Sequence, residues 1–195
     1  MSITNGYCTL AELKARLDIL DDKSDTILEQ NIEAASRKID GWCGRSFYSA
    51  TATRYFTPEQ WDVIDVPDLV SVTTLKTDED GDRTYETTWA TTDYELDPDT
   101  GPPYTSVYVT PSGYYAFPAG MRRSVQIVGT WGWSSVPHSI REATLILAAR
   151  YFKRKDSPMG AQIGNTEMGN LTIPANDADV TKLVSDYRRF ALVGV

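Results

Sequence analysis

The stretch Val125–Lys155, VQIVGTWGWSSVPHSIREATLILAARYFKRK, changes from a strand pattern to a helix pattern and divides the chain. Its first part, Val125–Trp131, has the Val, Ile, Thr and Trp content of a strand. Beyond Gly132 and Pro137 the apolar residues recur at helical spacing and share one face; they are Ile140, Ala143, Leu147, Ala148 and Tyr151. We therefore expect the chain to return here from a β-rich region to a helical one.

Both ends of this predicted helix carry terminal signals. Ser139 and Glu142 have the spacing of a capping box, although Pro137 could equally mark the first turn. The other end carries a basic group that suits the negative end of a helix dipole; it is Lys153, Arg154 and Lys155. This basic group has two interpretations: a solvated helix terminus, or a contact with DNA or an acidic partner.

Two further helices are predicted near the N-terminus. Thr9 and Glu12 form a T-x-x-E capping pattern that opens a short helix through about Leu17. A second helix is predicted over Asp25–Cys43, with Gly44 at its C-cap. Its apolar stripe comprises Leu28, Ile32, Ala35, Ile39 and Trp42. Such a stripe indicates either core packing or an interface between subunits, and the sequence does not separate the two.

The middle of the chain has the composition of strands and turns, rich in Thr, Tyr, Val and Trp and broken by Pro, Gly and Asp. We expect strands near Thr53–Phe56, Val63–Val66, Val70–Thr77, Thr84–Ala90, Tyr94–Leu96, Ser106–Thr110 and Ser124–Trp131. The dipeptide Asp80-Gly81 predicts a hairpin, and imperfect alternation predicts a bulge near Thr73–Thr74. Short strands without intervening helices favour an antiparallel sheet or a small barrel.

These patterns predict an α+β fold, in which N- and C-terminal helices form a small helical bundle around a β-rich insertion. A last helix is expected over Asp177–Phe190, after a loop at residues 156–174. The expected segments are 1–45 for the N-terminal helices and 46–131 for the insertion. Residues 132–195 are expected to hold the C-terminal helices, the loop and a docking tail.

Composition limits the possible functions. The chain has 195 residues, 41% of them hydrophobic, and a formal net charge of -8. An acidic chain is a poor candidate for gripping nucleic acid, but it suits a channel through which DNA must slide. Cys8 and Cys43 are expected to be buried thiols in a reducing cytoplasm. No apolar run approaches the roughly 20 residues that span a bilayer, so we expect no membrane partner.

Residues with catalytic or metal-binding chemistry are few. His138 is the only histidine, and no nucleophile-elbow pattern lies near it. Asp78, Asp80 and Asp82 resemble part of a calcium loop, but Gly81 comes too early for that loop. The glycines fit no phosphate-binding pattern. We therefore predict no catalytic residue, no cofactor and no metal.

Two N-terminal segments, CTLAELKARLDI and IEAASRKIDGWCGRSFY, are followed by RYF. In this order they resemble the N-terminal half of tailed-bacteriophage head–tail connector proteins, also called neck adaptors. The stretch VGTWGWSSVPHSIREATLILAARYFKRKDSP resembles the return from strand to helix in these proteins, and its most specific part is Gly132–Arg150. The resemblance covers nearly the whole chain, although smaller members of the family are almost wholly helical.

The resemblance implies a non-enzymatic virion protein of the neck, assembled in the bacterial cytoplasm. Such adaptors form a ring, typically of twelve copies, on the portal and extend the DNA channel toward a stopper or tail-side protein. DNA passes through without specific binding. The C-terminal segment of an adaptor docks on the portal, and the candidate docking residues here are Tyr187, Arg188, Arg189, Phe190, Leu192, Val193 and Val195.

Two other functions are weighed against a connector. The first is a tail-completion or minor tail protein, because those proteins also have β-rich cores. The second, ranked below both, is a small hydrolase or metal-binding enzyme that uses His138 or the loop around Asp78, Asp80 and Asp82.

Overall fold

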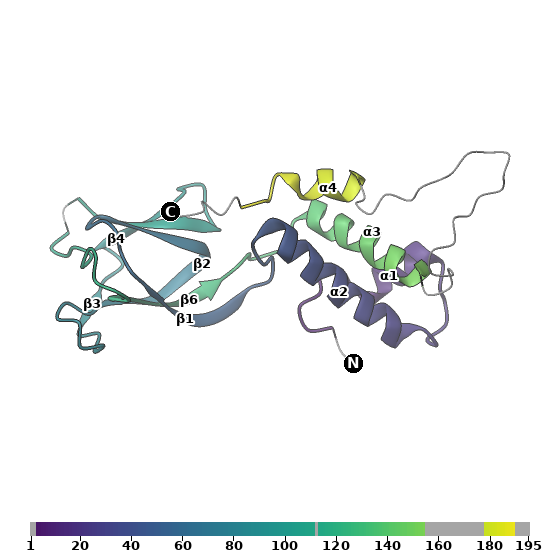
Figure 1. The fold of residues 1–195 in the computed structure, drawn as a ribbon, viewed down its shortest axis with the longest axis horizontal. Coiled ribbons are helices and arrows are strands. Elements are labelled where there is room, and N and C mark those ends of the chain that lie inside the picture. Colours follow the sequence, from purple (N-terminus) through teal and green to yellow (C-terminus); the bar gives the residue numbers. More distant parts are fainter. Residues whose placement is uncertain (1–2, 112, 155–177, 190–195) are drawn as a thin grey trace. The chain divides into compact units, whose positions relative to one another are not determined.

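The computed structural model describes residues 3–111, 113–154 and 178–189 (Figure 1). Within these ranges the chain has four helices and a six-stranded antiparallel sheet, which makes it an α+β protein. The chain divides into two compact units, one formed by Met1–Gly44 with Val136–Val195 and the other by Arg45–Ser135. We call them the helical unit and the β unit.

The helical unit contains α1 (Leu10–Leu17), α2 (Asp25–Cys43), α3 (His138–Arg154) and α4 (Ala178–Ser185). The helices α1, α2 and α3 contact one another, and α4 contacts α3 and α2. None of the helices in the described residues is long and apolar enough to cross a membrane.

Helix α2 has the predicted bounds and buries most of the predicted stripe. The prediction was wrong for Trp42, which is half-buried with the Lys38 ammonium 5.2 Å from its ring centroid. Cys43 is buried in its place. The reason is helical geometry, because a step of four from the buried Ile39 reaches Cys43. Gly44 ends the helix in the left-handed conformation, with φ of +65°, as a C-cap glycine does.

Helix α1 begins with the predicted capping box. The Glu12 amide donates to the Thr9 hydroxyl at 3.2 Å, and the Thr9 amide donates to the Glu12 carboxylate at 2.7 Å. Both cysteines, Cys8 and Cys43, are buried free thiols, as predicted. The start of the chain is tied to α2, since the Tyr7 amide donates to the Ser36 hydroxyl at 3.1 Å.

Helix α3 begins one residue before the predicted cap. Ser139 lies inside the helix, so the capping box predicted there is wrong. The Pro137 carbonyl accepts the first backbone hydrogen bond of the helix, in agreement with the alternative in which Pro137 marks the start. Glu142 accepts a hydrogen bond from Arg16 of α1 at 2.7 Å and is thereby used in tertiary packing. The last helix, α4, is shorter than predicted and ends at Ser185.

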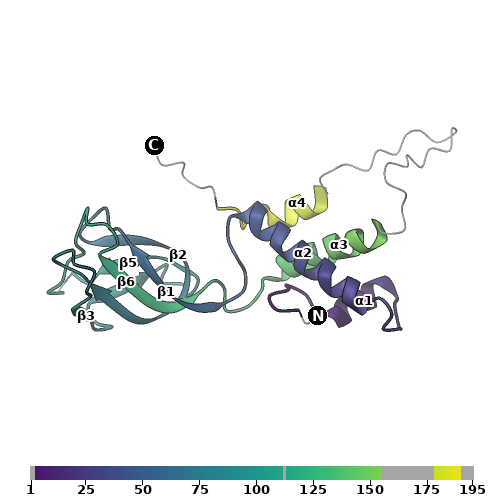
Figure 2. The ribbon, with the colours of Figure 1, turned by 60° about the horizontal axis from the view of Figure 1, so that its bottom comes forward.

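The β unit is a sheet with the strand order β1-β6-β2-β5-β4, and β3 pairs with β2 off this path. Figure 2 shows β1, β6 and β2 side by side, as this order requires. The strands are β1 (Ala50–Phe56), β2 (Val63–Thr77), β3 (Thr87–Trp89), β4 (Tyr94–Asp97), β5 (Tyr104–Val109) and β6 (Val125–Trp131).

Strand β2 joins two strands that the sequence predicted separately. Its first part pairs with β5 and its second part with β6, and its register shifts between Asp65 and Leu69. Pro67 lies in this gap, where the missing N–H costs no ladder hydrogen bond. The pairing with β6 shifts between Leu69 and Ser71 and again between Val72 and Thr74, and the last of these shifts confirms the predicted bulge. One continuous strand therefore belongs to both halves of the sheet. One half is β2 with β5 and β4, and the other is β2 with β6 and β1.

The inward side chains of both halves share one hydrophobic core. Trp89 and Phe117 stack at its centre, with ring centroids 4.7 Å apart. The other buried members are Ile64, Val66, Leu69, Leu75, Tyr94, Val107, Val125, Ile127 and Trp131. Both halves therefore contribute to one core, and Figure 1 shows β4 in the upper part of the β unit and β1 and β6 in its lower part.

Candidate assembly surfaces

Asp68 ties together the two segments through which the chain enters and leaves the β unit. Its buried carboxylate accepts a hydrogen bond from the Trp133 indole at 3.2 Å and lies 3.5 Å from Nε of Arg45. Its carbonyl accepts a hydrogen bond from the Gly132 amide at 2.7 Å. Trp131 is buried in the core. Trp131 is thus a core residue, and Trp133 is half-buried and held by Asp68.

His138 lies exposed at the first residue of α3. Within the described part of the chain, none of the hydrogen bonds and ion pairs involves its imidazole. The neighbouring Ser139 is a helical residue. The structure therefore places no base or carboxylate beside the histidine as a nucleophilic site requires.

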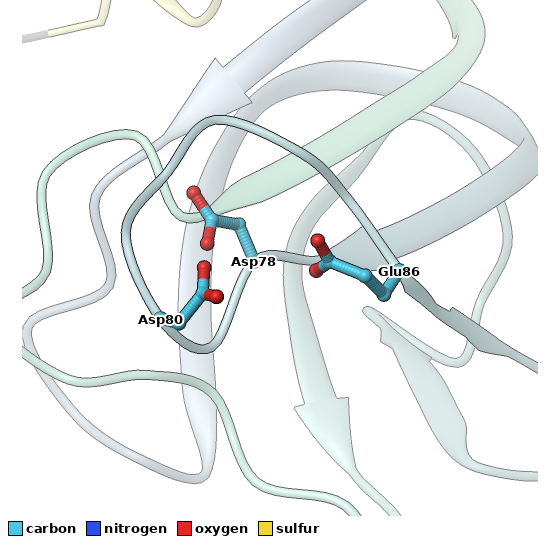
Figure 3. Close-up of side chains that lie close together, drawn as sticks. All are labelled: Asp78, Asp80 and Glu86. Carbon is cyan, nitrogen blue, oxygen red and sulfur yellow. The ribbon is translucent and has the colours of Figure 1, made fainter.

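The loop between β2 and β3 brings three carboxylates together: their oxygens at Asp78, Asp80 and Glu86 lie within 4.8 Å of one another (Figure 3). Asp78 is buried, and it accepts hydrogen bonds from the amides of Gly81 at 2.7 Å and Arg83 at 3.0 Å. Burial acts to raise the pKa of Asp78, but these amide hydrogen bonds outweigh it and lower that pKa below its ordinary value. Asp78 thus holds the turn.

The predicted partial calcium loop differs from this arrangement. Glu86, which was not predicted, joins Asp78 and Asp80, while Asp82 accepts a hydrogen bond from the Thr84 amide at 2.6 Å. Gly81 has φ of +84°, as the Asp-Gly hairpin signal requires. Calcium takes roughly 6–8 oxygen ligands. This site offers three carboxylates, and one of them already accepts hydrogen bonds from two loop amides. They are better explained as residues that stabilise the loop than as a calcium site.

The outward surface of β2, β5 and β4 is acidic. The register sets Asp65, Ser106 and Asp97 directly opposite one another, and sets Tyr108 opposite Glu95 in the next row. Directly opposite residues share one face of a sheet. Tyr108 is 43% exposed, and the three carboxylates are exposed as well. We call Asp65, Glu95, Asp97 and Tyr108 the acidic face.

The other half of the β unit carries a cluster of three arginines and two tyrosines. The Arg123 guanidinium lies 4.9 Å from the centroid of the Tyr55 ring, and the Tyr55 and Tyr85 centroids are 5.6 Å apart. The Tyr85 hydroxyl donates to the Arg123 carbonyl at 2.8 Å, and Arg83 donates to the Arg122 carbonyl. All three arginines are exposed. We call these five residues the arginine–tyrosine cluster.

This cluster was not predicted from the sequence. Tyr55, Arg83 and Arg123 lie on different segments and meet only because β1 pairs with β6 and the loop after β2 folds beside them. One signal was visible in the sequence. Residues 84–121 contain no lysine or arginine, and this stretch is bounded by Arg83 and Arg122.

The predicted docking residues are only partly within the described chain. After α4 the backbone turns, and the Arg189 amide donates to the Cys43 carbonyl at 2.8 Å, which ties this segment to the end of α2. Tyr187 is half-buried and Arg188 is exposed. The other predicted docking residues lie outside the described residues; they are Phe190, Leu192, Val193 and Val195.

The basic end of α3 is also only partly described. Lys153 and Arg154 are exposed in the last turn of the helix, and within the described residues neither forms an ion pair. Lys155 lies outside the described residues.

Comparison with known proteins gives one family and several similar structures. Residues 7–77 match the sequence model of the phage gp6-like head-tail connector protein family, and this match spans α1, α2, β1 and β2. No curated protein matches the chain by sequence. The resemblance to head–tail connector proteins that the sequence indicated is therefore confirmed over these residues.

The similar structures come from gene transfer agent (GTA) particles. The neck of an empty GTA particle computed with C6 symmetry has a chain with a TM-score of 0.62 and 22% identity. The neck of a native GTA particle computed with C12 symmetry gives a TM-score of 0.59 and 21% identity. The virion of a native GTA particle gives 0.59 and 22%. Each match covers 100% of this chain and 96% of the other chain, and at these identities it shows a shared fold.

Proposed function

We propose that this chain is a structural connector subunit in the neck of a phage or phage-like particle. In this role its copies form an oligomeric ring on the portal and extend the DNA channel toward the stopper or tail. The observation that carries the proposal is the agreement of two matches: a head-tail connector family over residues 7–77, and neck structures over the whole chain. The C6 and C12 symmetries of those necks support a ring, and we propose twelve copies.

The charge and the side chains of the protein fit a structural role. A net charge of -8 disfavours tight binding of DNA, so DNA can slide past without specific contacts. The carboxylates that gather around Asp78 hold a loop. We propose that the chain is not an enzyme, that residues 1–45 and 132–195 form one helical bundle, and that residues 46–131 form its insertion.

We propose that the segment from Tyr187 to Val195 docks on the portal. A deletion that tests this must spare the hydrogen bond between the Arg189 amide and the Cys43 carbonyl, which holds the end of the helical unit. Removing residues 190–195 satisfies this condition, whereas removing residues 188–195 also cuts the tie. We expect both shortened chains to fold, and we expect neither to join portal-bearing heads that lack the connector.

The control for this experiment is the thermal unfolding of each shortened chain, compared with that of the full chain. Removal of residues 190–195 should leave the unfolding midpoint unchanged, and removal of residues 188–195 should lower it slightly. If the chain without residues 190–195 still joins the heads as the full chain does, the docking assignment is wrong. If even the full chain binds purified tail tube and never portal, the protein is a tail-completion or minor tail protein.

We also propose that the basic end of α3, Lys153 to Lys155, contacts DNA or an acidic neighbour in the ring. The exposure of Lys153 and Arg154 supports this. Replacing both with glutamate should weaken assembly on the portal, or alter the release of DNA, without changing the unfolding midpoint. Unchanged assembly and unchanged DNA release would identify a solvated helix terminus.

A further inference from the structure

We propose that the β units of adjacent copies contact each other head to tail, with the arginine–tyrosine cluster of one copy on the acidic face of the next. This inference rests on the proposed ring function and names the surfaces that build the ring. The partner is therefore a second copy of this chain.

Charge complementarity is the first observation that carries the contact. Residues 55–75 and 84–121, which supply the acidic face, contain no lysine or arginine. Asp65, Glu95 and Asp97 thus have no cation from their own segments beside them. On the other side, none of Arg83, Arg122 and Arg123 forms an ion pair with a described residue. Neither these three carboxylates nor these three arginines form an ion pair with a described residue.

The helical unit, by contrast, pairs several of its charges internally. Four basic side chains of α1, α2 and α3 lie at N–O distances of 2.6 to 3.5 Å from carboxylates of the unit. The pairs are Lys14–Asp25, Arg16–Glu142, Arg37–Asp40 and Arg141–Glu12. In the β unit the ion pair between Arg45 and Asp68 involves neither the cluster nor the acidic face.

The position of the two surfaces is the second observation. The acidic face lies on the strands β2, β5 and β4, whereas the cluster is formed by Tyr55 of β1 and by loop residues after β2 and before β6. A contact between two different surfaces is heterologous and repeats from copy to copy, so it closes into a ring when the rotation allows. A contact of one surface with itself would end at a dimer. The β unit thus has the arrangement that a ring subunit needs.

The composition of both surfaces suits a protein partner. Arginine and tyrosine are enriched at protein interfaces, where the flat ring or guanidinium contributes large contact area. Tyr55 is 40% exposed beneath the Arg123 guanidinium, and Tyr108 is 43% exposed beside Glu95 and Asp97. An arginine stacked on a tyrosine is held ready for a carboxylate without a further loss of side-chain freedom.

The acidic loop beside the cluster, with Asp78, Asp80, Asp82 and Glu86, argues against nucleic acid. The carboxylates of Asp78, Asp80 and Asp82 each accept hydrogen bonds from loop amides, and they therefore serve the turn that carries Arg83. A phosphate backbone would lie along this loop and be repelled by it, because nucleic acid presents a continuous row of negative charges. The acidic face of a second copy is a compact group of carboxylates, and it can contact the arginines without lying along the acidic loop.

Reversal of charge tests the contact in both directions. Variant A carries Arg122→Glu and Arg123→Glu, and variant B carries Glu95→Arg and Asp97→Arg. A third chain carries all four changes. A matched control carries Lys23→Glu and Lys38→Glu, two exposed lysines of the helical unit outside every proposed contact, and it changes the net charge by the same amount as variant A does. The full-length proteins are incubated with portal-bearing heads that lack the connector, and the bound copies are counted by electron microscopy and sedimentation.

The contact predicts that variants A and B each assemble on the order of 100-fold more weakly than the wild type, because an attraction becomes a like-charge contact. The chain with all four changes should assemble like the wild type, and so should an equimolar mixture of variants A and B. The matched control should assemble at a level closer to the wild type than variant A does. Thermal unfolding checks that each variant folds, and Arg122→Glu alone replaces variant A if the double change unfolds.

Other outcomes separate this inference from the proposed function. Rings that form equally well from the wild type and from variants A and B would overturn the contact and leave the connector function intact. An equal loss of assembly in the matched control would show that net charge alone weakens assembly, and it would overturn the contact. Normal rings from variant A, with weakened retention of duplex DNA, would make the cluster a DNA contact. A wild-type chain that never binds heads or forms any oligomer would overturn the proposed function itself.

Discussion

Gly132 permits the close crossing of the segments that enter and leave the β unit, and Gly132→Ala should be among the most damaging single changes. Its φ is +101°, where a residue with a Cβ is strained by about 1–3 kcal/mol. An added Cβ would overlap the carbonyl oxygen of Tyr48 and lie 2.9 Å from its carbonyl carbon. Since backbone atoms cannot rotate away, the two segments must separate by about 1.5 Å before the Cβ and the Tyr48 oxygen reach ordinary contact distance.

This separation also weakens the hydrogen bond that the Gly132 amide donates to the Asp68 carbonyl at 2.7 Å, which contributes about 1 kcal/mol. With the backbone strain and the overlap included, we expect Gly132→Ala to lower the free energy of unfolding of the β unit by about 3–5 kcal/mol. Gly101→Ala is the matched control. Gly101 has φ of +104°, but an added Cβ there has nothing within 4 Å, so only the backbone strain remains.

Urea unfolding followed by tryptophan fluorescence measures the difference, because four of the five tryptophans belong to the β unit. We expect Gly132→Ala to unfold at least about 1 M earlier than Gly101→Ala, given slopes of about 1–3 kcal/mol per molar urea. Far-UV circular dichroism follows the helical unit in the same samples. Equal unfolding free energies for the two variants would refute the reasoning that the crossing, and not the φ angle alone, requires glycine.

Three other predictions concern the helical unit. Gly41→Ala should stabilise it by about 0.5–1 kcal/mol, because an added Cβ meets nothing within 4 Å on an exposed helix position; thermal unfolding checks this. Glu12→Gln should destabilise it at neutral pH, because the hydrogen bond from the Thr9 amide lowers the pKa of Glu12. The stabilisation is complete above the ordinary pKa of 4.5 and is lost as the pH falls through the lowered value. The difference in unfolding free energy between Glu12→Gln and the wild type should therefore shrink in acid and stay constant at neutral and higher pH. Burial raises the pKa of Cys8 to about 12, so iodoacetamide should label it slowly in the folded protein and rapidly in denaturant; rapid labelling of the folded protein would show that the helical unit opens easily.

Local signals predicted the helices well where the cap and the stripe agree. Helix α2 has its predicted bounds because a regular stripe precedes a glycine that ends the helix in the left-handed conformation. The prediction failed at α3, where Ser139 and Glu142 have the spacing of a cap. Glu142 instead pairs with Arg16 of α1, a residue more than a hundred positions away. The glutamate side chain can either cap the helix or pair with a residue from another helix. The spacing of Ser139 and Glu142 does not show which of the two it does.

The sequence by itself determined the α+β class, the helical spacing, the turn chemistry and the stretch without basic residues that makes one surface acidic, because each depends on neighbouring residues. Only the tertiary structure decided that β2 is one strand shared by both halves of the sheet, and which outward side chains share a face. Pairing and register join residues far apart in the chain, and a shift of one residue would turn every side chain to the other side. The arginine–tyrosine cluster, the acidic face and the tie at Asp68 exist through that pairing.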